Sequence, residues 1–550
     1  MRAFRALMAI ALLAVPAALH GEDSPPRRPN ILLIVADDIG YTDLGSYGSE
    51  IPTPNLDRLA ARGVRFSDFH TGMTCSPTRA MLMSGVDHHQ AGLGNMAEDL
   101  APNQKGKPGY EGYLNFRVAA LPEVLKQAGY RTLMAGKWHL GMTEETSPAA
   151  RGFDQSFASL QGGAGHFADM APLVGPGKAK YRDGRAMVDH LPADFYSTRY
   201  FTDKVLDYLG SGSADERRKP FFAYLAFTAP HWPIQAPDES LARFAGRYQD
   251  GYDALFNKRL AAAKRLGLAP PGAKGAARSP YGRPWTALSA DERRIETRKM
   301  QAFAAMVSDL DSQVGRVLDW LEKTGQSDNT IILFLSDNGY EGHDLRREFP
   351  EAAEWSRNFN NDLERIGKAG SYVWMGPDWA RASSAPFRLY KGYPTEGGTR
   401  VPFIVSIPGV TKERPATARG HVTDIMPTLL ELARVKAPAA TFAGRAILPM
   451  SGRSMVPYLK DKAASIHAPA EPFAQELFGK RAIRVGRWKA IAMPAPYGAG
   501  RWQLYDIERD PAERVDLAAR HPRRVRAMSE QWDRWARQGN VIMPDWVSGY

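Results

Sequence analysis

Pairs of polar side chains directly follow two short apolar runs of the sequence. Asp37 and Asp38 end one run, and Asp337 and Asn338 end another. Two adjacent carboxylates repel each other unless one is protonated or a cation lies between them. Carboxylate and amide oxygens suit a hard cation, and calcium is favoured because it accepts many oxygen ligands in flexible geometry. Such pairs are also typical of solvated turns, so spacing alone leaves both interpretations open.

Cys75 is the only cysteine in 550 residues, so the chain has no internal disulfide. Ser76 suits a helix N-cap and Pro77 suits the first helical position, so we expect a short helix that begins at Pro77 and ends at Gly85. Cys75 would then lie beside the positive helix N-terminus, where anions bind readily, with Arg79 one turn away. A buried structural cysteine and a plain thiol nucleophile are the alternatives.

Further apolar runs lead to other polar side chains that could do chemistry. One precedes Lys137 and His139, and another precedes His231. Continuous apolar runs bounded by turn residues favour strands that are buried on both faces, as in a parallel sheet. Because ligands bind beyond the carboxyl ends of such strands, we expect these polar groups to converge on one crevice. The predicted strands are 31–36, 132–135, 221–227, 330–335 and 402–407.

Helical patterns alternate with these strands, as at 118–125 and 303–321, which predicts a large α/β domain with helices on both faces of the sheet. After about residue 460 the pattern changes to short strands and one closing helix, which predicts a smaller α+β domain. We place the large domain at 28–460 and the smaller domain at 461–550. The expected C-terminal elements are strands at 481–492 and 501–507 and a helix at 522–538, and an exposed insertion is expected at 268–285.

The N-terminus is similar to a secretory signal. Arg2 and Arg5 precede the apolar run Leu7–Val15, which is too short to span a bilayer. We therefore expect a signal peptide at 1–21, a periplasmic or secreted protein, and no stable membrane insertion after signal removal; an uncleaved anchor is the alternative. The net charge is +11, but no nucleic-acid-reading motif accompanies it, so nucleic acid is not an expected partner.

Two segments carry a resemblance to a known family. The segment from Cys75 to Arg79, Cys-Ser-Pro-Thr-Arg, resembles the sulfatase signature Cys-x-Pro-x-Arg, in which the cysteine is oxidised to formylglycine (3-oxoalanine). Thr78 departs conservatively from the serine that is commonest there. The segment 136–141, Gly-Lys-Trp-His-Leu-Gly, resembles the second sulfatase signature. The resemblance extends from about Pro29 into the C-terminal domain, and it is closest to bacterial arylsulfatases.

The resemblance implies a fold, a metal and partners. The fold is that of the alkaline phosphatase superfamily: a large mixed, mostly parallel sheet between helices, with a smaller C-terminal α+β domain. One calcium ion would be bound by Asp37, Asp38, Asp337, Asn338 and the modified Cys75. The partners would be a small-molecule sulfate ester and, transiently, the maturase that converts the cysteine.

The resemblance also implies roles in sulfate ester hydrolysis. Arg79 would steady the formylglycine, and Lys137 would contact both formylglycine and sulfate. His139 would hold a formylglycine hydroxyl. His231 and Lys391 would face the leaving-group oxygen.

Two other functions compete with this one. Phosphonate or phosphate ester hydrolases of the same superfamily share the cysteine signature, but they tend to carry histidine after the aspartate of the second metal pair. Asn338 stands at that position and favours calcium and sulfate. The other alternative is a catalytically inactive calcium-binding protein.

Overall fold

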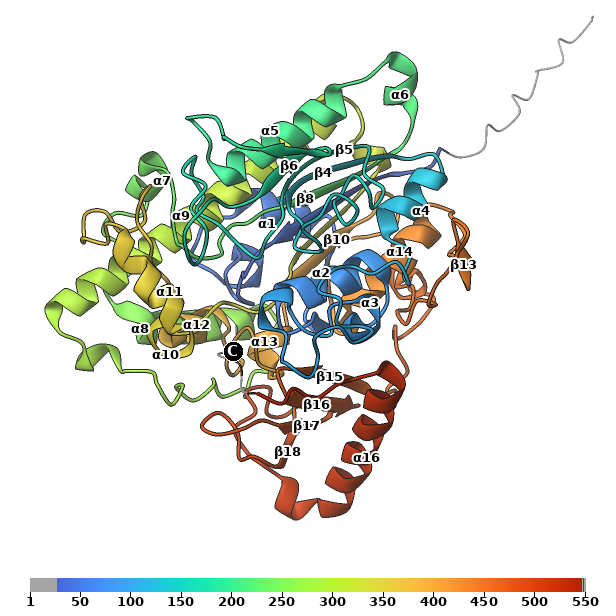
Figure 1. Cartoon of the computed structure of the whole chain (residues 1–550). Helices are drawn as coiled ribbons and strands as arrows, with labels where there is room; N and C mark the ends of the chain where they lie inside the picture. Colours follow the sequence, from blue (N-terminus) through green and yellow to red (C-terminus); the bar gives the residue numbers. More distant parts are fainter. Residues whose placement is uncertain (1–26, 547, 549–550) are drawn as a thin grey trace, which may run out of the picture.

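The computed structural model describes residues 27–546 and 548, so the predicted signal peptide at 1–21 lies outside the described part of the chain. Its centre is a ten-stranded sheet in the order β11-β2-β10-β9-β1-β8-β4-β5-β6-β7 (Figure 1). The five strands β9, β1, β8, β4 and β5 are mutually parallel. Their bounds are β1 Asn30–Ala36, β4 Arg131–Lys137, β5 Gln155–Ser159, β8 Phe221–Ala226 and β9 Thr330–Ser336.

The strands at the margins of the sheet make it mixed. β10 pairs antiparallel with both β9 and β2, and β6 pairs antiparallel with β5 and β7. The predicted strand at 402–407 is confirmed as β10, but its carboxyl end points away from those of the parallel group. The bounds are β2 Val64–Phe66, β6 Tyr181–Asp183, β7 Ala186–Val188, β10 Phe403–Ser406 and β11 Arg414–Ala416.

Alternate side chains of β1 belong to two hydrophobic cores, one on each face of the sheet. Leu32 and Ile34 pack in the core that contains α1, α5 and α9, and Ile31 and Leu33 pack in the core that contains α2, α4 and α14. Each such buried aliphatic side chain contributes roughly 1.5–3 kcal/mol relative to exposure. The helix bounds are α1 Pro54–Ala61, α2 Cys75–Ser84, α4 Leu121–Gln127, α5 Ser197–Gly210, α9 Ala290–Lys323 and α14 Ile425–Leu432.

The helix at the cysteine begins earlier than predicted. α2 starts at Cys75, with Thr74 as its N-cap, so the assignment of Ser76 as the cap is wrong. Pro77 becomes the third helical residue, where a missing N–H is tolerated because the first-turn N–H groups have no partner within the helix. Gly85 ends the helix with φ 67°, as predicted.

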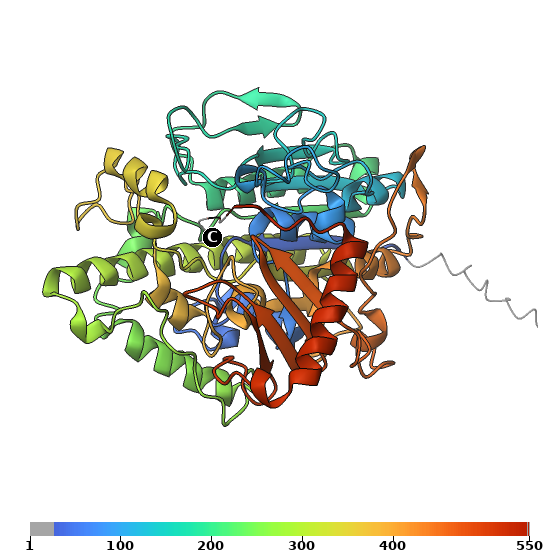
Figure 2. The ribbon, with the colours of Figure 1, turned by 60° about the horizontal axis from the view of Figure 1, so that its bottom comes forward.

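A second, antiparallel sheet of four strands in the order β15-β16-β17-β18 forms the C-terminal part, with α16 against it (Figures 1 and 2). One predicted strand, 481–492, is two strands joined at a turn, where Gly486 has φ 59°. The strand β15 was not predicted. The bounds are β15 Phe473–Leu477, β16 Lys480–Val485, β17 Trp488–Ala492, β18 Trp502–Asp506 and α16 Pro522–Gly539.

The two sheets share a hydrophobic core. Ile483, Leu504 and Trp532 form a core between the small sheet and α16, whereas Ile491 and Tyr505 join the core of the large sheet. The expected architecture, a mostly parallel sheet between helices with a smaller C-terminal α+β part, is confirmed. The boundary at 460/461 remains a prediction.

Shorter elements cover the edges of the molecule. Residues 268–284 contain no helix or strand and are mostly exposed, in agreement with the expected insertion. No helix within residues 27–546 is both long enough and apolar enough to cross a membrane. Further helices are α3 His88–Ala91, α6 Ala214–Arg218, α7 Asp238–Ala242, α8 Gly251–Arg265, α10 Leu345–Glu348, α11 Pro350–Trp355, α12 Pro377–Ser383, α13 Glu396–Thr399 and α15 Val456–Leu459, and further strands are β3 Phe69–His70, β12 Gly420–His421, β13 Thr441–Phe442 and β14 Arg445–Ala446.

Candidate active site

The carboxyl ends of β1 and β9 bring the two predicted metal pairs into contact. The Asn338 side chain donates a hydrogen bond to Asp38 Oδ1 at 2.6 Å, and the Asp38 backbone N–H lies 3.4 Å from Asp337 Oδ1. The four side chains are fully or almost fully buried. The two strands are adjacent and in register, with Ala36 opposite Ser336, which is why the residues that follow them meet.

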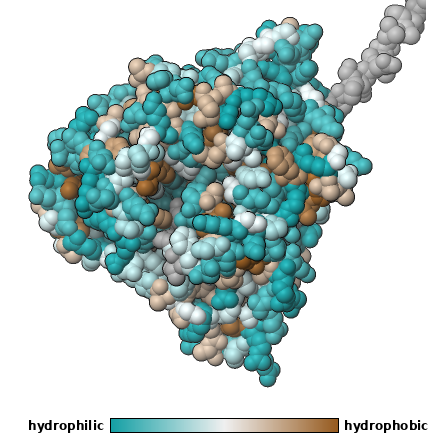
Figure 3. Space-filling model, in the orientation of Figure 1, coloured by the Kyte–Doolittle hydropathy of each residue, from teal (hydrophilic) through white to brown (hydrophobic). Residues whose placement is uncertain are grey.

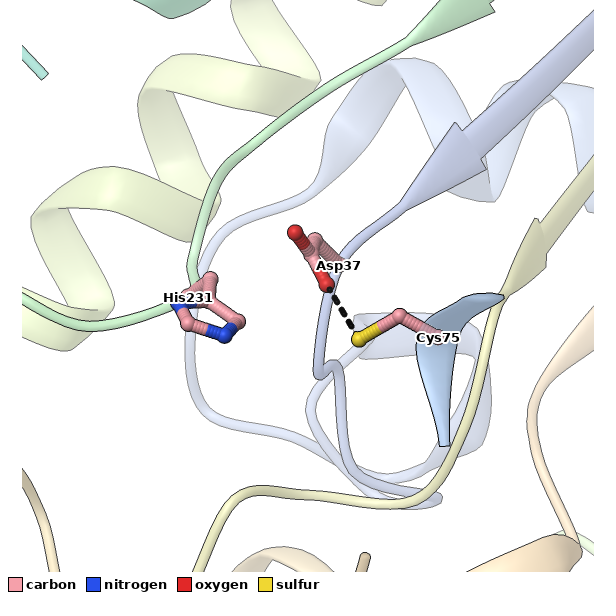
Figure 4. A group of neighbouring side chains, drawn as sticks. All are labelled: Asp37, Cys75 and His231. Carbon is pink, nitrogen blue, oxygen red and sulfur yellow. Dashed lines mark hydrogen bonds between the residues drawn. The ribbon is translucent and has the colours of Figure 1, made fainter. Parts of the chain in front are cut away.

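Cys75 joins this group from α2. Its Sγ lies 3.5 Å from Asp37 Oδ1, and Figure 4 shows His231 on the other side of Asp37. Burial and the charge of Asp337 raise the pKa of the Cys75 thiol well above its usual value, against the opposing effect of Lys137. A thiol that stays protonated at neutral pH is a poor nucleophile. The raised pKa of Cys75 therefore counts against a mechanism in which the unmodified thiol is the nucleophile.

Each carboxylate of the group has a cationic partner. Lys137 Nζ lies 2.7 Å from Asp37, Arg79 Nη2 lies 2.7 Å from Asp337, and Lys391 Nζ lies 3.0 Å from Asp38. Burial opposes ionisation of Asp37, but Lys137 and Arg79 nevertheless hold its pKa below the usual value. A site of this kind combines fixed negative and positive charge away from water, where electrostatic interactions are strong.

The oxygen atoms of the strand ends fit a hard cation. Asp37, Asp38, Asp337 and Cys75 each place one ligand atom so that all four lie within 4.8 Å of one another. Burial raises the pKa of Asp38 to about 8, with Lys391 opposing the effect and Asp37 adding to it, so the ionised form of Asp38 is unfavourable here without a further positive charge. Asn338 Oδ1 is buried and has no hydrogen-bond partner among the described residues. A cation coordinated by these oxygens would satisfy both groups.

The two histidines approach from different strands. His231 follows β8, and its Nε2 lies 3.7 Å from Asp38 Oδ2. Burial, together with Lys391 and Lys137, lowers the pKa of His231 well below its usual value. His139 follows β4 and has a left-handed backbone, with φ 54°. Its Nε2 contacts Glu98 Oε1 at 2.9 Å, and not the carboxylates at the ends of β1 and β9.

Several residues of the site carry no sequence signal that would have identified them. Glu98 pairs with His139, Glu341 lies 3.5 Å from Lys391, and the Tyr224 hydroxyl accepts a hydrogen bond from Arg79 at 3.3 Å. Glu98 lies in a short 3₁₀ helix, Ala97–Asp99, that follows neither a strand end nor a recognisable motif. Only the tertiary structure brings it to the site.

An open cavity of about 590 Å³ has His139 and Glu98 in its wall. Most of its other lining side chains are apolar, and lysine and arginine do not occur among them. The space-filling view shows a hollow near the middle of one face, bordered in part by hydrophobic residues (Figure 3). The apolar lining includes Leu93, Met142, Leu160, Leu173, Val174, Trp232 and Phe349.

The family model described as Sulfatase matches residues 29–435. The chain belongs to the sulfatase family. A second model, described as N-sulphoglucosamine sulphohydrolase, C-terminal, matches residues 389–533 of this sulfatase. The family match makes the chain a sulfatase enzyme.

Relatives of this sulfatase span nearly its whole length. An uncharacterized sulfatase of Schizosaccharomyces pombe is 44% identical, covering 94% of this chain and 95% of the relative. The arylsulfatase of Klebsiella aerogenes is 38% identical, covering 78% of this chain and 91% of the relative. The solved structure of Ps i-CgsB in complex with k-i-k-neocarrahexaose has a TM-score of 0.66 at 24% identity, with 95% of both chains covered. That structure supports the fold alone.

Proposed function

We propose that this sulfatase cleaves sulfate esters with a formylglycine formed from Cys75 and with one bound calcium ion. The observation that carries the proposal is the position of Cys75 at the start of α2, buried beside Asp37 and surrounded by carboxylates with cationic partners. A lone thiol whose pKa is raised has little use as a nucleophile there. Oxidation to an aldehyde gives the position a chemical role.

Asp37, Asp38, Asp337 and Asn338 would hold the calcium ion together with an oxygen of the modified residue 75. When bound, the ion would supply positive charge that activates a hydroxyl and stabilises the sulfuryl oxygens. The donor set contains only oxygens once the cysteine is converted, which suits calcium better than zinc. Asn338, in place of a histidine, supports calcium and a sulfate substrate over the transition metal of a phosphonate hydrolase.

Once converted to a hydrated formylglycine, residue 75 would offer one hydroxyl for attack on sulfur and a second hydroxyl through which the sulfate could be expelled. His231, with Lys391 beside it, would give a proton to the departing alcohol, which requires the negative charge of the bound sulfate to raise the pKa that burial and the two lysines lower. His139 would take a proton from the second hydroxyl. Lys137 and Arg79 would stabilise negative charge and keep residue 75 oriented.

The cavity next to His139 supports an apolar organic group on the substrate. Its lining is largely aliphatic and aromatic and contains no lysine or arginine, so it offers little to a polyanionic sulfated sugar. The relative from Klebsiella aerogenes is an arylsulfatase. We therefore propose aryl or alkyl sulfates as substrates. We also propose a maturase that converts Cys75 as a transient partner, and a periplasmic or secreted location.

The first test compares nitrophenyl sulfate with nitrophenyl phosphate on purified protein and measures the mass of the peptide that contains residue 75. We expect faster sulfate cleavage and a peptide lacking the thiol. Cys75→Ala should abolish turnover without loss of the fold, as measured by circular dichroism. An active protein whose Cys75 reacts quantitatively with a thiol reagent would refute the formylglycine, and preferential phosphate cleavage would favour the phosphonate hydrolase alternative.

The second test concerns the metal. Elemental analysis should find about one calcium per chain, and Asp337→Ala should lower both calcium content and activity because it removes a ligand and leaves Arg79 unpaired. Asp215→Ala is the control, since Asp215 pairs with Arg218 on the surface and its side chain is 81% exposed. Stoichiometric zinc without calcium in the active enzyme would contradict the proposal.

A further inference from the structure

The two ring nitrogens of His139 have different surroundings. Nε2 lies 2.9 Å from Glu98 Oε1, whereas Nδ1 is buried and has no hydrogen-bond partner among the described residues. The side chain is almost fully buried, and its backbone adopts the left-handed region with φ 54°, which is uncommon for residues other than glycine. Strain of this kind persists only where the surrounding structure fixes the residue.

The neighbours of His139 hold its ring in one orientation. A Cβ added to Gly162 would lie 3.0 Å from the ring carbon Cε1, so the ring packs closely against the backbone there. The segment that carries Glu98 is braced by Asn95, whose side chain donates to the Asp99 carbonyl at 2.7 Å and to Gln104 Oε1 at 3.0 Å. The carboxylate and the ring therefore face each other from two fixed loops.

We propose that Glu98 is a positioning residue for His139. Its carboxylate accepts the hydrogen bond of Nε2–H and so fixes the tautomer in which Nδ1 carries a free lone pair. This inference rests on the proposed function, in which His139 acts as a base. An ionised carboxylate can only accept hydrogen bonds, so the proton between the two groups belongs to Nε2.

The charge state of Glu98 agrees with this arrangement. The Glu98 side chain is 48% exposed, and its partial desolvation opposes ionisation, but the neighbouring His139 and the hydrogen bond between them lower its pKa to about 2. Glu98 is thus ionised throughout the neutral range. The Glu98 carboxylate lies at one nitrogen of the His139 ring, and the other nitrogen, Nδ1, is free. In other hydrolases this arrangement orients a histidine base, and the carboxylate stabilises the protonated form of the histidine.

In the step that this pair serves, Nδ1 takes the proton of the hydroxyl on residue 75 that did not attack. The electron pair of that O–H bond forms the carbonyl, and the carbon–oxygen bond to the sulfate breaks, so sulfate leaves with the electron pair. The proton passes from His139 to water. No oxidant or other co-reactant is needed. The alcohol has already left, so the step is independent of its identity.

The kinetic test uses Glu98→Gln and Glu98→Ala with nitrophenyl sulfate. If sulfate release is slowed, kcat and KM should fall together by about tenfold or more, while kcat/KM changes less than about threefold, because kcat/KM reports the earlier cleavage step. A burst of about one nitrophenol per modified active site should precede the slow steady state. Glu98→Asp should restore part of kcat.

The matched control is Glu144→Gln, since Glu144 lies in the loop after His139 but pairs with Arg185 on the surface. Formylglycine content and thermal melting are measured for every variant, so that a loss of modified protein is not mistaken for slow release. A fall in kcat/KM without a burst would place Glu98 in substrate binding or in cleavage and overturn the proposal, as would unchanged kcat.

A second measurement does not depend on activity or on folding of the Glu98 variants. Nitrogen NMR of histidine-labelled unsubstituted enzyme reports which ring nitrogen carries the proton, and His139→Ala assigns the signal. We expect Nε2 protonated and Nδ1 unprotonated at neutral pH. The opposite tautomer would overturn the positioning role of Glu98 and leave the sulfatase function standing. Absence of sulfate ester cleavage by the unsubstituted enzyme, with the expected tautomer present, would overturn the proposed function instead.

Discussion

Asp38 shows at a single residue why the site fits the proposed cation. It has a left-handed backbone with φ 71°, accepts a hydrogen bond from the Asn338 side chain, and has Lys391 as its cationic partner. Burial would normally exclude such a carboxylate unless it is paired or coordinated. The same buried position keeps water from screening the charges that act on a sulfate group.

The two histidines should differ in their dependence on the leaving group. A proton donor matters most when the departing alcohol is a poor leaving group. His231→Ala should therefore slow alkyl sulfates by about 10²-fold or more and nitrophenyl sulfate much less, provided that cleavage of the sulfur–oxygen bond limits the rate. His139→Ala should slow release of sulfate whatever the alcohol.

The measurement is a series of kcat/KM values over alcohols of different acidity, combined with intact-mass detection of protein-bound sulfate. Bound sulfate should accumulate in His139→Ala and not in His231→Ala. The reverse pattern would show that the roles are exchanged. Equal losses across all leaving groups in His231→Ala would show that this residue only positions the substrate.

At the scale of elements, the hairpin between β15 and β16 supports the active-site loops. Leu477 and Phe478 at its tip pack with Met73, two residues before Cys75, and with Met96. Lys480 donates a hydrogen bond to the Gly392 carbonyl at 3.0 Å. The C-terminal sheet thus contacts the segments that carry Cys75, Glu98 and Lys391.

Lys480 should make stability depend on pH. Burial lowers its pKa to about 7, against a small opposing effect of Glu348. Between this value and the ordinary lysine pKa the unfolded chain binds a proton that the folded chain lacks, so this group makes stability rise with pH over about 7 to 10. Below pH 7 the cost of the buried charge is fully present. Lys480→Met should remove up to about 5 kcal/mol of this dependence.

The check is chemical denaturation followed by tryptophan fluorescence at pH 6, 8 and 10. The difference in unfolding free energy between Lys480→Met and the unsubstituted protein should shrink or change sign as pH rises. Lys462→Met, which alters an exposed lysine, serves as the control and should show no such trend. A parallel pH dependence in the two proteins would show that Lys480 has the same pKa in the folded and the unfolded chain.

The sequence predicted the elements whose signal is local. Each apolar run that was expected to be a buried strand is one, and the residues after β1, β4, β8 and β9 meet because those strands are parallel neighbours. The turn at Gly486 and the start of α2 at Cys75 were misjudged because boundaries depend on packing around them. Glu98 and Lys480 could not be predicted, since they reach the site from elements whose position only the tertiary structure sets.

At the scale of the whole molecule, a buried network of charges joins the C-terminal sheet to the large domain. Arg484 of β16 makes two hydrogen bonds of 2.8 Å to Asp68, and Lys489 of β17 lies 2.7 Å from Glu396. Glu396 also contacts His70 at 3.2 Å. The cations come from the C-terminal sheet and the carboxylates come from the large domain. Each part of the protein therefore buries charges that are compensated by charges of the other part. Replacing such pairs by apolar groups is often tolerated, but removing one partner is not.

Arg484→Ala should therefore destabilise the protein by about 3 kcal/mol or more, because it leaves the buried Asp68 without its bidentate partner. Arg501→Ala is the control: Arg501 pairs with Asp516 while its side chain is 61% exposed, and its loss should cost less than about 1 kcal/mol. Unfolding followed by fluorescence measures both. The double variant Asp68→Leu with Arg484→Met should recover much of the loss, since no charge is then left unpaired between these two positions. If Arg484→Ala costs no more than Arg501→Ala, the network does not hold the C-terminal sheet against the large domain, and the shared hydrophobic core must do so alone.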